Sequence, residues 1–425
     1  MALASFLGTV IEFYDFGIYA TAAALVFASA FFPALGEQSG TIVAFATLGV
    51  AFVARPLGAV LFGHIGDRLG RKRTLIATMS LMGAATVLIG LLPTAATIGV
   101  MAPILLVLLR IAQGLAAGGE WAGAALFTSE HAPRDRRGFW AMFTNLGGAT
   151  ANILSMGTFL LTGLYMSDDD FVAWGWRVPF LISVVLVFVG LYVRLRIEET
   201  PAFTASAKRG EAGTGLPFKE ALAHQWKEIL LGAGSLVMAF SLGYIGIAFL
   251  TNYGTATLGL ARTDVLAAGM FGNLVNCLAI FSGGVLSDRF GRRRVLLTAN
   301  GVGVVWALLL FPVLDIGTLG AFWLGQTVTF MIAGIGFGIA GSFLSELFHT
   351  RYRYTASGLA YSSAGVLGGA IPPLVAATLI GTYGGFVFGA FLAGYCLLGL
   401  LCTLAVKETR GRDLVEDALP REATG

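Results

Sequence analysis

Long apolar runs alternate with short polar segments along the whole chain. Each run holds about 20 residues, enough for a helix to cross the roughly 30 Å hydrocarbon core of a bilayer. Spanning β-strands would instead show strict alternation over about 10 residues, whereas segment 75–92 is apolar on every helical face. The pattern therefore predicts membrane-spanning helices. Twelve are expected, near residues 5–31, 40–63, 74–94, 99–124, 139–164, 177–196, 227–250, 264–286, 295–314, 319–342, 355–379 and 385–405.

The composition also indicates that lipid surrounds much of the chain. Hydrophobic residues make up 56% of the 425 residues and charged residues 12%, with a mean hydropathy of +0.81, whereas a soluble domain is about 25% charged. The net charge of +3 is too small to indicate a nucleic-acid partner. The three cysteines and four histidines form no metal-binding spacing, and no phosphate-binding loop is present. We expect no metal and no cofactor, and transport driven by an ion gradient rather than by ATP.

Basic residues are confined to alternate loops. Most of the 27 Lys and Arg follow the even-numbered spans or lie at the C-terminus. The opposite loops hold only Arg177 and Arg262, together with the acidic run 168–170. By the positive-inside rule, we expect a multi-pass protein of the cell membrane with both termini and all basic loops in the cytoplasm.

The chain contains an internal repeat. The segment GHIGDRLGRKR, which begins at Gly63, recurs as GVLSDRFGRRR from Gly284, each time between the second and third spans of a half. A Ser-Glu pair followed by Arg also recurs, as does a Glu-Thr pair at the end of each half. These matches indicate a duplicated six-span unit. The expected parts are a first bundle at 1–197, a cytoplasmic linker at 198–226 with a short interfacial helix from about 217, a second bundle at 227–406, and a cytoplasmic tail at 407–425.

The repeated motifs predict a gate at the cytoplasmic mouth. Their glycines permit a sharp turn, and Asp67 or Asp288 can cap a neighbouring helix or pair with a basic side chain. The alternative is that the arginines only anchor the loops by the positive-inside rule. The gate residues are Gly63, Asp67, Arg68, Gly70, Arg71, Glu130 and Arg137 in the first half and Asp288, Arg289, Gly291, Arg292, Glu346 and Arg353 in the second.

The paired loops resemble the signature of the major facilitator superfamily. Further segments resemble its metabolite:proton symporter family, most closely the shikimate-transporter-like members: EFYDF from Glu12, RPLG from Arg55, RIAQG from Arg110, WGWR from Trp174 and ETPAF from Glu199. The resemblance implies an all-α membrane protein with twelve transmembrane helices in two pseudo-symmetric six-helix bundles. It also implies proton-coupled symport of a small organic acid by alternating access, and we expect a monomer.

Ionisable residues within the spans should carry the chemistry, because each costs about 2.5–3.5 kcal/mol at the centre of a membrane helix. All of them lie in the first half, at Glu12, Asp15, Arg55, Arg110 and Glu120. At about 100° per residue, Glu12 and Asp15 share one face of span 1. Arg110 and Glu120 similarly share one face of span 4.

Asp15 and Arg110 both fall near the middle of the membrane and could meet there. We predict that Asp15, with Glu12 and Glu120, carries the coupling proton, while Arg110 holds a substrate carboxylate. An arriving carboxylate would weaken the hold of Arg110 on Asp15 and favour its protonation. The alternative is a permanent Asp15–Arg110 pair that only fastens spans 1 and 4.

Polar side chains in other spans complete the predicted substrate site, since they can donate hydrogen bonds into a central cavity. For each of them, packing between helices is the alternative. Asn145 and Asn152 lie seven residues apart on one face of span 5 and are open to the same two interpretations. The predicted substrate-binding residues are Arg110, Arg55, Tyr19, Gln113 and Asn152 in the first half and Asn273, Asn276, Gln326 and Tyr361 in the second.

These features favour a transporter rather than an enzyme. The expected partners are a small-molecule carboxylate, such as shikimate or a related hydroxy or keto acid, together with protons and the lipid bilayer. Three alternatives remain: a proline or betaine proton symporter, a proton-coupled drug antiporter, and a membrane sensor that transports nothing. Relatives of the first kind tend to carry a long coiled-coil extension, whereas segment 407–425 is short and lacks heptads.

Overall fold

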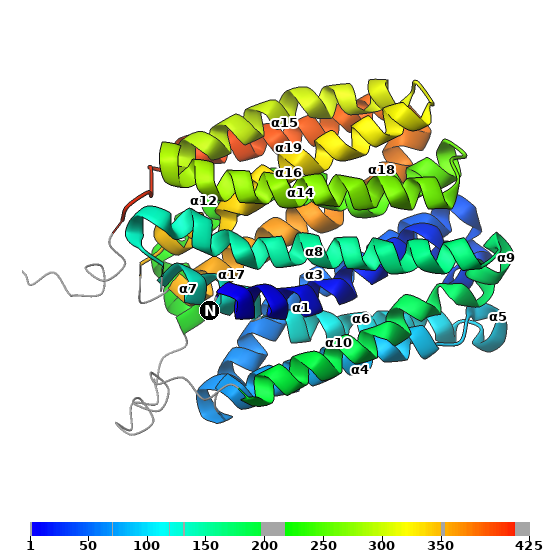
Figure 1. The fold of residues 1–425 in the computed structure, drawn as a ribbon, viewed down its shortest axis with the longest axis horizontal. Helices are drawn as coiled ribbons and strands as arrows, with labels where there is room; N and C mark the ends of the chain where they lie inside the picture. The colour runs from blue at the N-terminus through cyan, green and yellow to red at the C-terminus, as the bar shows by residue number, and fades with distance from the viewer. Residues whose placement is uncertain are drawn as a thin grey trace, which may run out of the picture.

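The structure, a computed structural model, describes residues 2–69, 71–118, 120–130, 132–196, 217–349 and 353–412. Within these ranges the chain forms helices joined by short connections, and no strand occurs there. The side chains at 63–73, and those of Glu120 and Glu130, are outside the described set. Figure 1 shows the long helices running side by side along the long axis of the molecule.

The first half of the chain supplies the first six predicted spans. Span 1 breaks after Leu25, and the described residues of span 4 form two helices, Met101–Ala117 and Glu120–Glu130. The span helices are α1 (Ala2–Leu25) with α2 (Phe27–Phe31), α3 (Gly36–Leu69), α4 (Arg71–Leu91), α6 (Met101–Ala117) with α7 (Glu120–Glu130), α8 (Arg137–Tyr165) and α10 (Arg177–Arg196). The connecting elements are η1 (Pro33–Leu35), α5 (Ala95–Ile98), η2 (Arg134–Arg136), α9 (Asp168–Asp170) and η3 (Phe171–Gly175).

The second half supplies the other six. Spans 7 and 11 contain π-helical stretches, which add a residue to a helical turn and occur often at functional sites. The elements are α12 (Pro217–Tyr244), η4 (Ile245–Phe249), α13 (Leu250–Asn252) and η5 (Tyr253–Thr257) for span 7, then α14 (Arg262–Phe290), α15 (Arg292–Leu314), α16 (Leu319–Leu347), α17 (Arg353–Ala364) with η6 (Gly365–Ala370) and α18 (Ile371–Tyr383), and α19 (Gly385–Ala405). All twelve predicted spans thus coincide with helices, and the predicted fold class is confirmed.

Seven helices in the described residues are long and apolar enough to cross a membrane by themselves. An eighth candidate is the pair Asp168–Gly175 and Arg177–Tyr192, which is bent by 46°. Shorter apolar helices cover Ile76–Leu91 and Met101–Ala117. We attribute the absence of α1 and α8 from this group to the polar residues that they carry. Such residues mark the two helices as facing the interior of the bundle.

Two predicted backbone features are visible. Gln225 has non-helical angles inside α12 (φ −130°, ψ 24°), so the stretch from Pro217 is set off from the span by a kink where a short interfacial helix was expected. Gly291 has φ 98° and separates α14 from α15. A positive φ is accessible to glycine at little cost, so this glycine of the second motif makes the sharp turn between the two helices.

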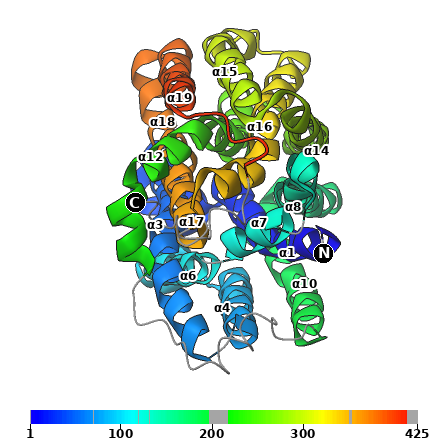
Figure 2. The same ribbon diagram turned by 90° about the vertical axis from the view of Figure 1, so that its left-hand side faces the viewer.

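The two halves meet along several helix pairs. α8 packs against α14 and α16, α3 against α18 and α17, α7 against α17, and α1 against η4. Figure 2 looks along the bundle from one end, with helices of the first half below and those of the second half above. We call this end, where Arg137, Arg292 and Arg412 lie, the basic end; the opposite end carries Asp168 and Arg262.

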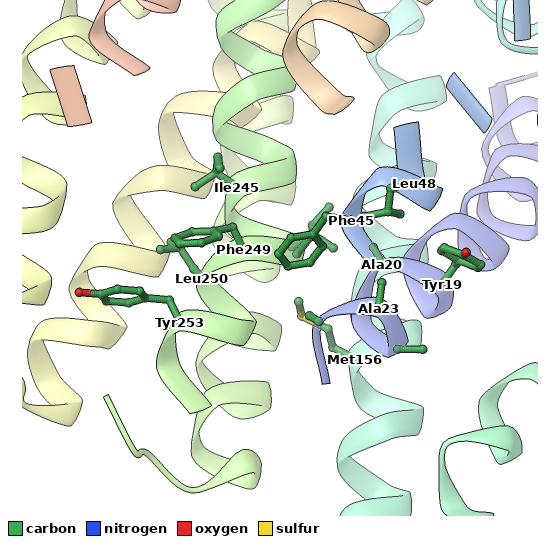
Figure 3. Close-up of a cluster of buried hydrophobic side chains, with 14 of the residues drawn as sticks. Tyr19, Ala20, Ala23, Phe45, Leu48, Met156, Ile245, Phe249, Leu250 and Tyr253 are labelled. Carbon is green, nitrogen blue, oxygen red and sulfur yellow. The ribbon is translucent and has the colours of Figure 1, made fainter. Parts of the chain in front are cut away.

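A hydrophobic cluster fills the interface between the halves toward the opposite end. Figure 3 shows Ala20 and Leu48 of the first half together with Ile245 and Phe249 of the second. All four side chains are buried. This cluster leaves the polar part of the interface nearer to the middle of the bundle.

Candidate functional site

A cavity lies between the two halves near the centre of the bundle. The volume that the centre of a water-sized molecule can occupy in it is about 40 Å³. This is room for a few waters, but a ring-shaped metabolite would fit only if side chains moved. It is lined by Phe13, Phe16, Gly17 and Ala20 of α1, Asn145, Gly148, Ala149 and Asn152 of α8, Phe240, Gly243, Tyr244 and Ile247 of span 7, Asn276 and Ile280 of α14, Phe330 and Phe337 of α16, and Tyr361 of α17.

The cavity wall is aromatic, with a few polar groups. Among the described residues that line it, none is charged. Such a composition is typical of small-molecule sites, in which rings supply contact area and a few polar groups fix orientation. We therefore take this cavity as the candidate substrate site.

Asn145 lines the cavity on the side of the basic end and makes hydrogen bonds to both halves. Its Nδ2 donates to the main-chain carbonyl of Phe337 at 2.7 Å. Its Oδ1 accepts hydrogen bonds from Trp121 Nε1 at 3.2 Å and from the hydroxyl of Tyr361 at 3.2 Å. Asn145 and Trp121 belong to the first half, and Phe337 and Tyr361 to the second, so one side chain fastens four helices.

Asn276 also lines the cavity. Its Nδ2 donates to Oδ1 of Asn273 at 3.5 Å, while its own Oδ1 is buried without a hydrogen-bond partner in the part of the chain that the structure describes. Asn273 in turn donates to the carbonyl of Gly269 at 3.1 Å. Oδ1 of Asn276 lies next to Gly334 of α16, and a buried, unsatisfied carbonyl oxygen of this kind costs free energy.

Arg110 lies behind the wall formed by α1. Its guanidinium carbon is 3.9 Å from the ring centre of Tyr19 and 4.7 Å from that of Phe16. Nη1 donates to Gln113 Oε1 at 2.9 Å, and Gln113 Nε2 donates to Thr86 at 2.7 Å. Arg110 is fully buried, and its Nε and Nη2 have no hydrogen-bond partner among the described residues.

Arg55 approaches the same ring from α3. Its guanidinium carbon is 4.2 Å from the ring centre of Phe16, 4.8 Å from that of Phe52 and 5.9 Å from that of Phe13. Its Nε and Nη2 are also buried without a hydrogen-bond partner in the described part of the chain. Phe16 therefore contacts two buried guanidinium groups and lines the cavity at the same time.

The predicted proton-carrying residues sit on the same helix as Phe16. Glu12 and Asp15 are both buried. Arg110 Nη1 donates to Gln113, and its guanidinium group also contacts the rings of Tyr19 and Phe16 on α1. Glu120, the third predicted carrier, lies outside the described side chains.

The predicted substrate residues divide into two groups by location. Asn152, Asn276 and Tyr361 line the cavity. The others lie behind its wall: Arg55, Arg110, Tyr19 and Gln113 in the first half, and Asn273 and Gln326 in the second. Gln326 donates to the carbonyl of Gly246 in the π-helical stretch at 2.7 Å, and Tyr19 donates to Thr47 at 2.6 Å.

Gate residues of the second motif form an ion-pair cluster at the basic end. Arg292 Nε donates to Glu346 Oε2 at 3.1 Å, and Arg292 Nη1 donates to Asp288 Oδ1 at 2.6 Å. Arg137, from the first half, lies 3.6 Å from Glu346. Arg292 and Glu346 are fully buried, so the charges are compensated by each other rather than by water.

Asp288 also joins the two halves directly. Its Oδ1 accepts from the amide of Gly138 at 2.8 Å, and its Oδ2 accepts from the amide of Phe139 at 2.8 Å. These amides lie in the first turn of α8, where helix N–H groups lack partners within the helix. A carboxylate of α14 therefore caps a helix of the other half.

The C-terminal segment completes the basic end. Glu408 accepts from the amides of Arg292 and Arg293 at 2.9 and 3.2 Å, which caps α15. Arg137 Nη1 donates to the carbonyl of Arg412 at 2.6 Å, and Arg410 donates to the carbonyl of Arg289 at 2.8 Å. The segment that follows α19 thus contacts both halves.

The remaining gate residues are placed as follows. Arg353, at the start of α17, is buried. Gly63, Asp67, Arg68, Gly70, Arg71 and Glu130, with the predicted linker up to residue 216, lie outside the residues or side chains that the structure describes.

Contacts also join the two halves at the opposite end. Arg262 Nη1 lies 2.6 Å from Asp168 Oδ1, and its guanidinium carbon is 3.8 Å from the ring centre of Phe171. Asn252 donates to the carbonyl of Ala24 at 3.0 Å. Each of these contacts joins the two halves, so the halves are linked at this end as well as at the basic end.

Several lining residues were not among the predicted substrate residues. Phe16, Phe240, Phe330 and Phe337 looked like ordinary apolar residues of membrane helices, and only the packing shows which rings face the cavity. Asn145 did carry a signal in the sequence, because its spacing from Asn152 places both on one face of α8.

Comparison with known proteins identifies the family. The model of the "Sugar (and other) transporter" family matches residues 1–418. The chain belongs to this family. It is one of the families of the major facilitator superfamily, whose two-bundle architecture the helices described above reproduce. This transporter family member is therefore a multi-pass membrane transporter and not an enzyme.

Relatives and structural neighbours agree with that assignment. The chain is 40% identical to the inner membrane metabolite transport protein YhjE of Escherichia coli K12, over 97% of this chain and 94% of the relative. It is 40% identical to the shikimate transporter of the same organism, over 96% and 94%, and 32% identical to its proline/betaine transporter, over 97% and 84%. The xylose transporter XylE of E. coli, in a partially occluded inward-open conformation, superimposes with a TM-score of 0.75 at 16% identity, over 97% of this chain and 99% of XylE.

Proposed function

We propose that this transporter is a proton-coupled symporter that takes up a small organic acid, such as shikimate or a related hydroxy or keto acid. The observation that carries the proposal is the pair Arg55 and Arg110 beside the wall of the central cavity, because Nε and Nη2 of each are buried without a hydrogen-bond partner in the described part of the chain. A guanidinium fork matches a carboxylate in charge and geometry. The 40% identity to a shikimate transporter supports the same class of substrate.

Asp15 and Glu12 are the proposed proton carriers. Both are buried on α1, the helix that also places Phe16 between the arginines and the cavity. A carboxylate that binds near the arginines competes with these side chains for the same positive charge, which favours their protonation. Substrate and proton would then enter the occluded state together.

Alternating access is the proposed transport mechanism. We propose that the halves, at 1–197 and 227–406, rock about the central cavity and that the basic end faces the cytoplasm, as the positive-inside rule requires. The cavity lies between the two halves of one chain, so a monomer suffices for transport.

Uptake by purified protein in liposomes tests the proposal. Radiolabelled shikimate should accumulate when an inwardly directed proton gradient is imposed, and a protonophore should abolish accumulation. An Arg110→Lys variant should retain the charge but lose the bidentate fork, and so take up shikimate poorly. Accumulation that does not depend on the proton gradient would contradict proton coupling. If no carboxylate is taken up, the proposed class of substrate is wrong.

Betaine or proline is the second candidate substrate. The aromatic wall favours it, because the faces of Phe and Tyr rings bind quaternary ammonium groups, and the proline/betaine relative covers nearly the whole chain. Uptake decides between the two. If the carboxylate with its hydroxyl groups is recognised, labelled shikimate should enter and excess unlabelled betaine should not reduce its uptake. If the ammonium group is recognised, labelled betaine should enter and shikimate should not.

A further inference from the structure

Phe16 occupies an unusual position in the described structure. Its side chain lines the central cavity, and its ring centre is 4.2 Å from the guanidinium carbon of Arg55 and 4.7 Å from that of Arg110. Neither arginine lines the cavity. The Phe16 ring therefore adjoins both the cavity and the two guanidinium groups.

The neighbouring rings do not share this position. Phe52 is 4.8 Å from Arg55 but does not line the cavity. Phe13 lines the cavity and is 5.9 Å from Arg55, and no contact with Arg110 is found for it in the described part of the chain. Among the described rings, only Phe16 both lines the cavity and stacks against both guanidinium groups. Tyr244 also lines the cavity and interacts electrostatically with both arginines.

The two guanidinium groups can each donate further hydrogen bonds. Nε and Nη2 of each are buried and lack hydrogen-bond partners among the described residues. A ring face compensates part of the charge of a guanidinium but cannot accept its directional N–H bonds in the way that a carboxylate does. The ring centre also lies at about the distance from each guanidinium that a carboxylate adopts in an ion pair.

We propose that Phe16 is the residue that admits a substrate carboxylate to Arg55 and Arg110: its ring swings away, and the carboxylate takes its place. This inference rests on the proposed function, since it assigns a gating residue to the same site. A ligand with a carboxylate can displace the ring because it gains charge-assisted hydrogen bonds from both arginines. An uncharged ligand of the same shape gains none of these bonds and leaves the ring in place, so only an anionic ligand moves Phe16.

Chemical modification tests the inference without a known substrate. Phenylglyoxal, which reacts with accessible guanidinium groups, is applied to the purified protein, and modification of Arg55 and Arg110 is measured by peptide mass spectrometry. The variants are Phe16→Leu and Phe16→Ala, with Phe330→Ala as the matched control, because Phe330 also lines the cavity but packs on Gly246 and Gly272 of the second half. Both Phe16 variants should be modified about tenfold faster than wild type, and the control should not. Equal rates in all four proteins would overturn the proposal.

A measurement of ligand binding is the second test of the role of Phe16. Shikimate and its uncharged methyl ester are titrated against the same proteins. Phe16→Leu should bind shikimate about tenfold more tightly than wild type, because no ring contact with the arginines has to be broken, and should bind the ester unchanged. An equal change for acid and ester, or the same change in Phe330→Ala, would show that Phe16 only packs the cavity. If wild-type protein binds neither compound, the proposed substrate is wrong, while the modification rates still decide the role of Phe16.

Discussion

The indole of Trp121 lies flat against the phenol ring of Tyr361, with ring centres 3.4 Å apart and planes 8° apart. Trp121 belongs to α7 of the first half and Tyr361 to α17 of the second. Both donate to the same oxygen of Asn145, the residue that closes the cavity toward the basic end. This stack must separate whenever the basic end opens, so its strength sets part of the balance between the occluded and open states.

Replacing Trp121 by leucine should therefore open the basic end. Loss of the stack and of one hydrogen bond should cost the closed state about 1–2 kcal/mol, a shift of about 5–30-fold in population. The readout is the rate at which a maleimide alkylates A149C, a cysteine placed in the cavity wall, in a background from which the three native cysteines have been removed.

The matched control is Trp226→Leu, because Trp226 lies on α12 and is half exposed. Its replacement should leave the alkylation rate at the wild-type value. An unchanged rate in Trp121→Leu as well would mean that the stack does not hold the gate.

The cap that Asp288 provides to α8 gives a second prediction. Asp288→Ala removes the acceptor for two amides and a partner of Arg292, and loss of a cap costs about 0.5–2 kcal/mol. Uptake should fall and A149C should react faster, whereas Asp288→Asn should be intermediate because its amide oxygen still accepts. Asp264→Asn, an exposed change at the other end of α14, is the control. Faster labelling in the control than in Asp288→Ala would refute the capping role.

Gln113 offers a way to test what Arg110 does. In Gln113→Glu a permanent carboxylate would face Arg110, where the amide oxygen now accepts at 2.9 Å. Hydrogen bonds to charged groups contribute about 1.5–3 kcal/mol, so the variant should unfold at a higher temperature and lose carboxylate uptake, since the site is already occupied.

The control is Gln326→Glu, in which the new carboxylate would face the carbonyl of Gly246. That variant should be less stable than wild type because two acceptors would meet without a proton between them. If Gln113→Glu transports as well as wild type does, Arg110 fastens helices and does not bind substrate.

The ion pair at the opposite end should contribute little by itself. The Asp168 side chain is 85% exposed, whereas that of Arg262 is 12% exposed, and exposed pairs contribute about 0–1 kcal/mol. Asp168→Asn should therefore change transport only slightly, and less at high salt. Arg262→Ala should have a larger effect because it also removes the contact with Phe171. Equal effects of the two substitutions in uptake assays would show that the charge, and not the ring contact, closes this end.

Much of the fold could be predicted from the sequence because membrane helices have to be long and apolar. Each of the twelve predicted spans coincides with one or more helices, and the turn at Gly291 and the capping role open to Asp288 followed from residue chemistry. The interruptions in spans 7 and 11 were not predicted. Their π-helical stretches, η4, η5 and η6, depend on packing against neighbouring helices. The pattern of apolar residues in a span does not indicate that packing.

The candidate site was harder to predict. The buried charges were found because their cost in lipid makes them conspicuous. Which of them face the cavity depends on the rotation of each helix within the bundle and on rotamers. Arg110 thus turns toward the rings of Tyr19 and Phe16 rather than toward the cavity. The stack of Trp121 on Tyr361 joins residues from opposite halves, and no local pattern indicates it.

The central claim is that substrate and proton move together, with Asp15 as a carrier. The most direct measurement uses liposomes that contain the purified protein and a trapped pH-sensitive dye, with no proton gradient imposed. Adding shikimate outside should acidify the interior of liposomes with wild-type protein. Liposomes with Asp15→Asn should exchange labelled for unlabelled shikimate without any pH change. Shikimate entry without acidification in wild type, or acidification that persists in Asp15→Asn, would contradict the account.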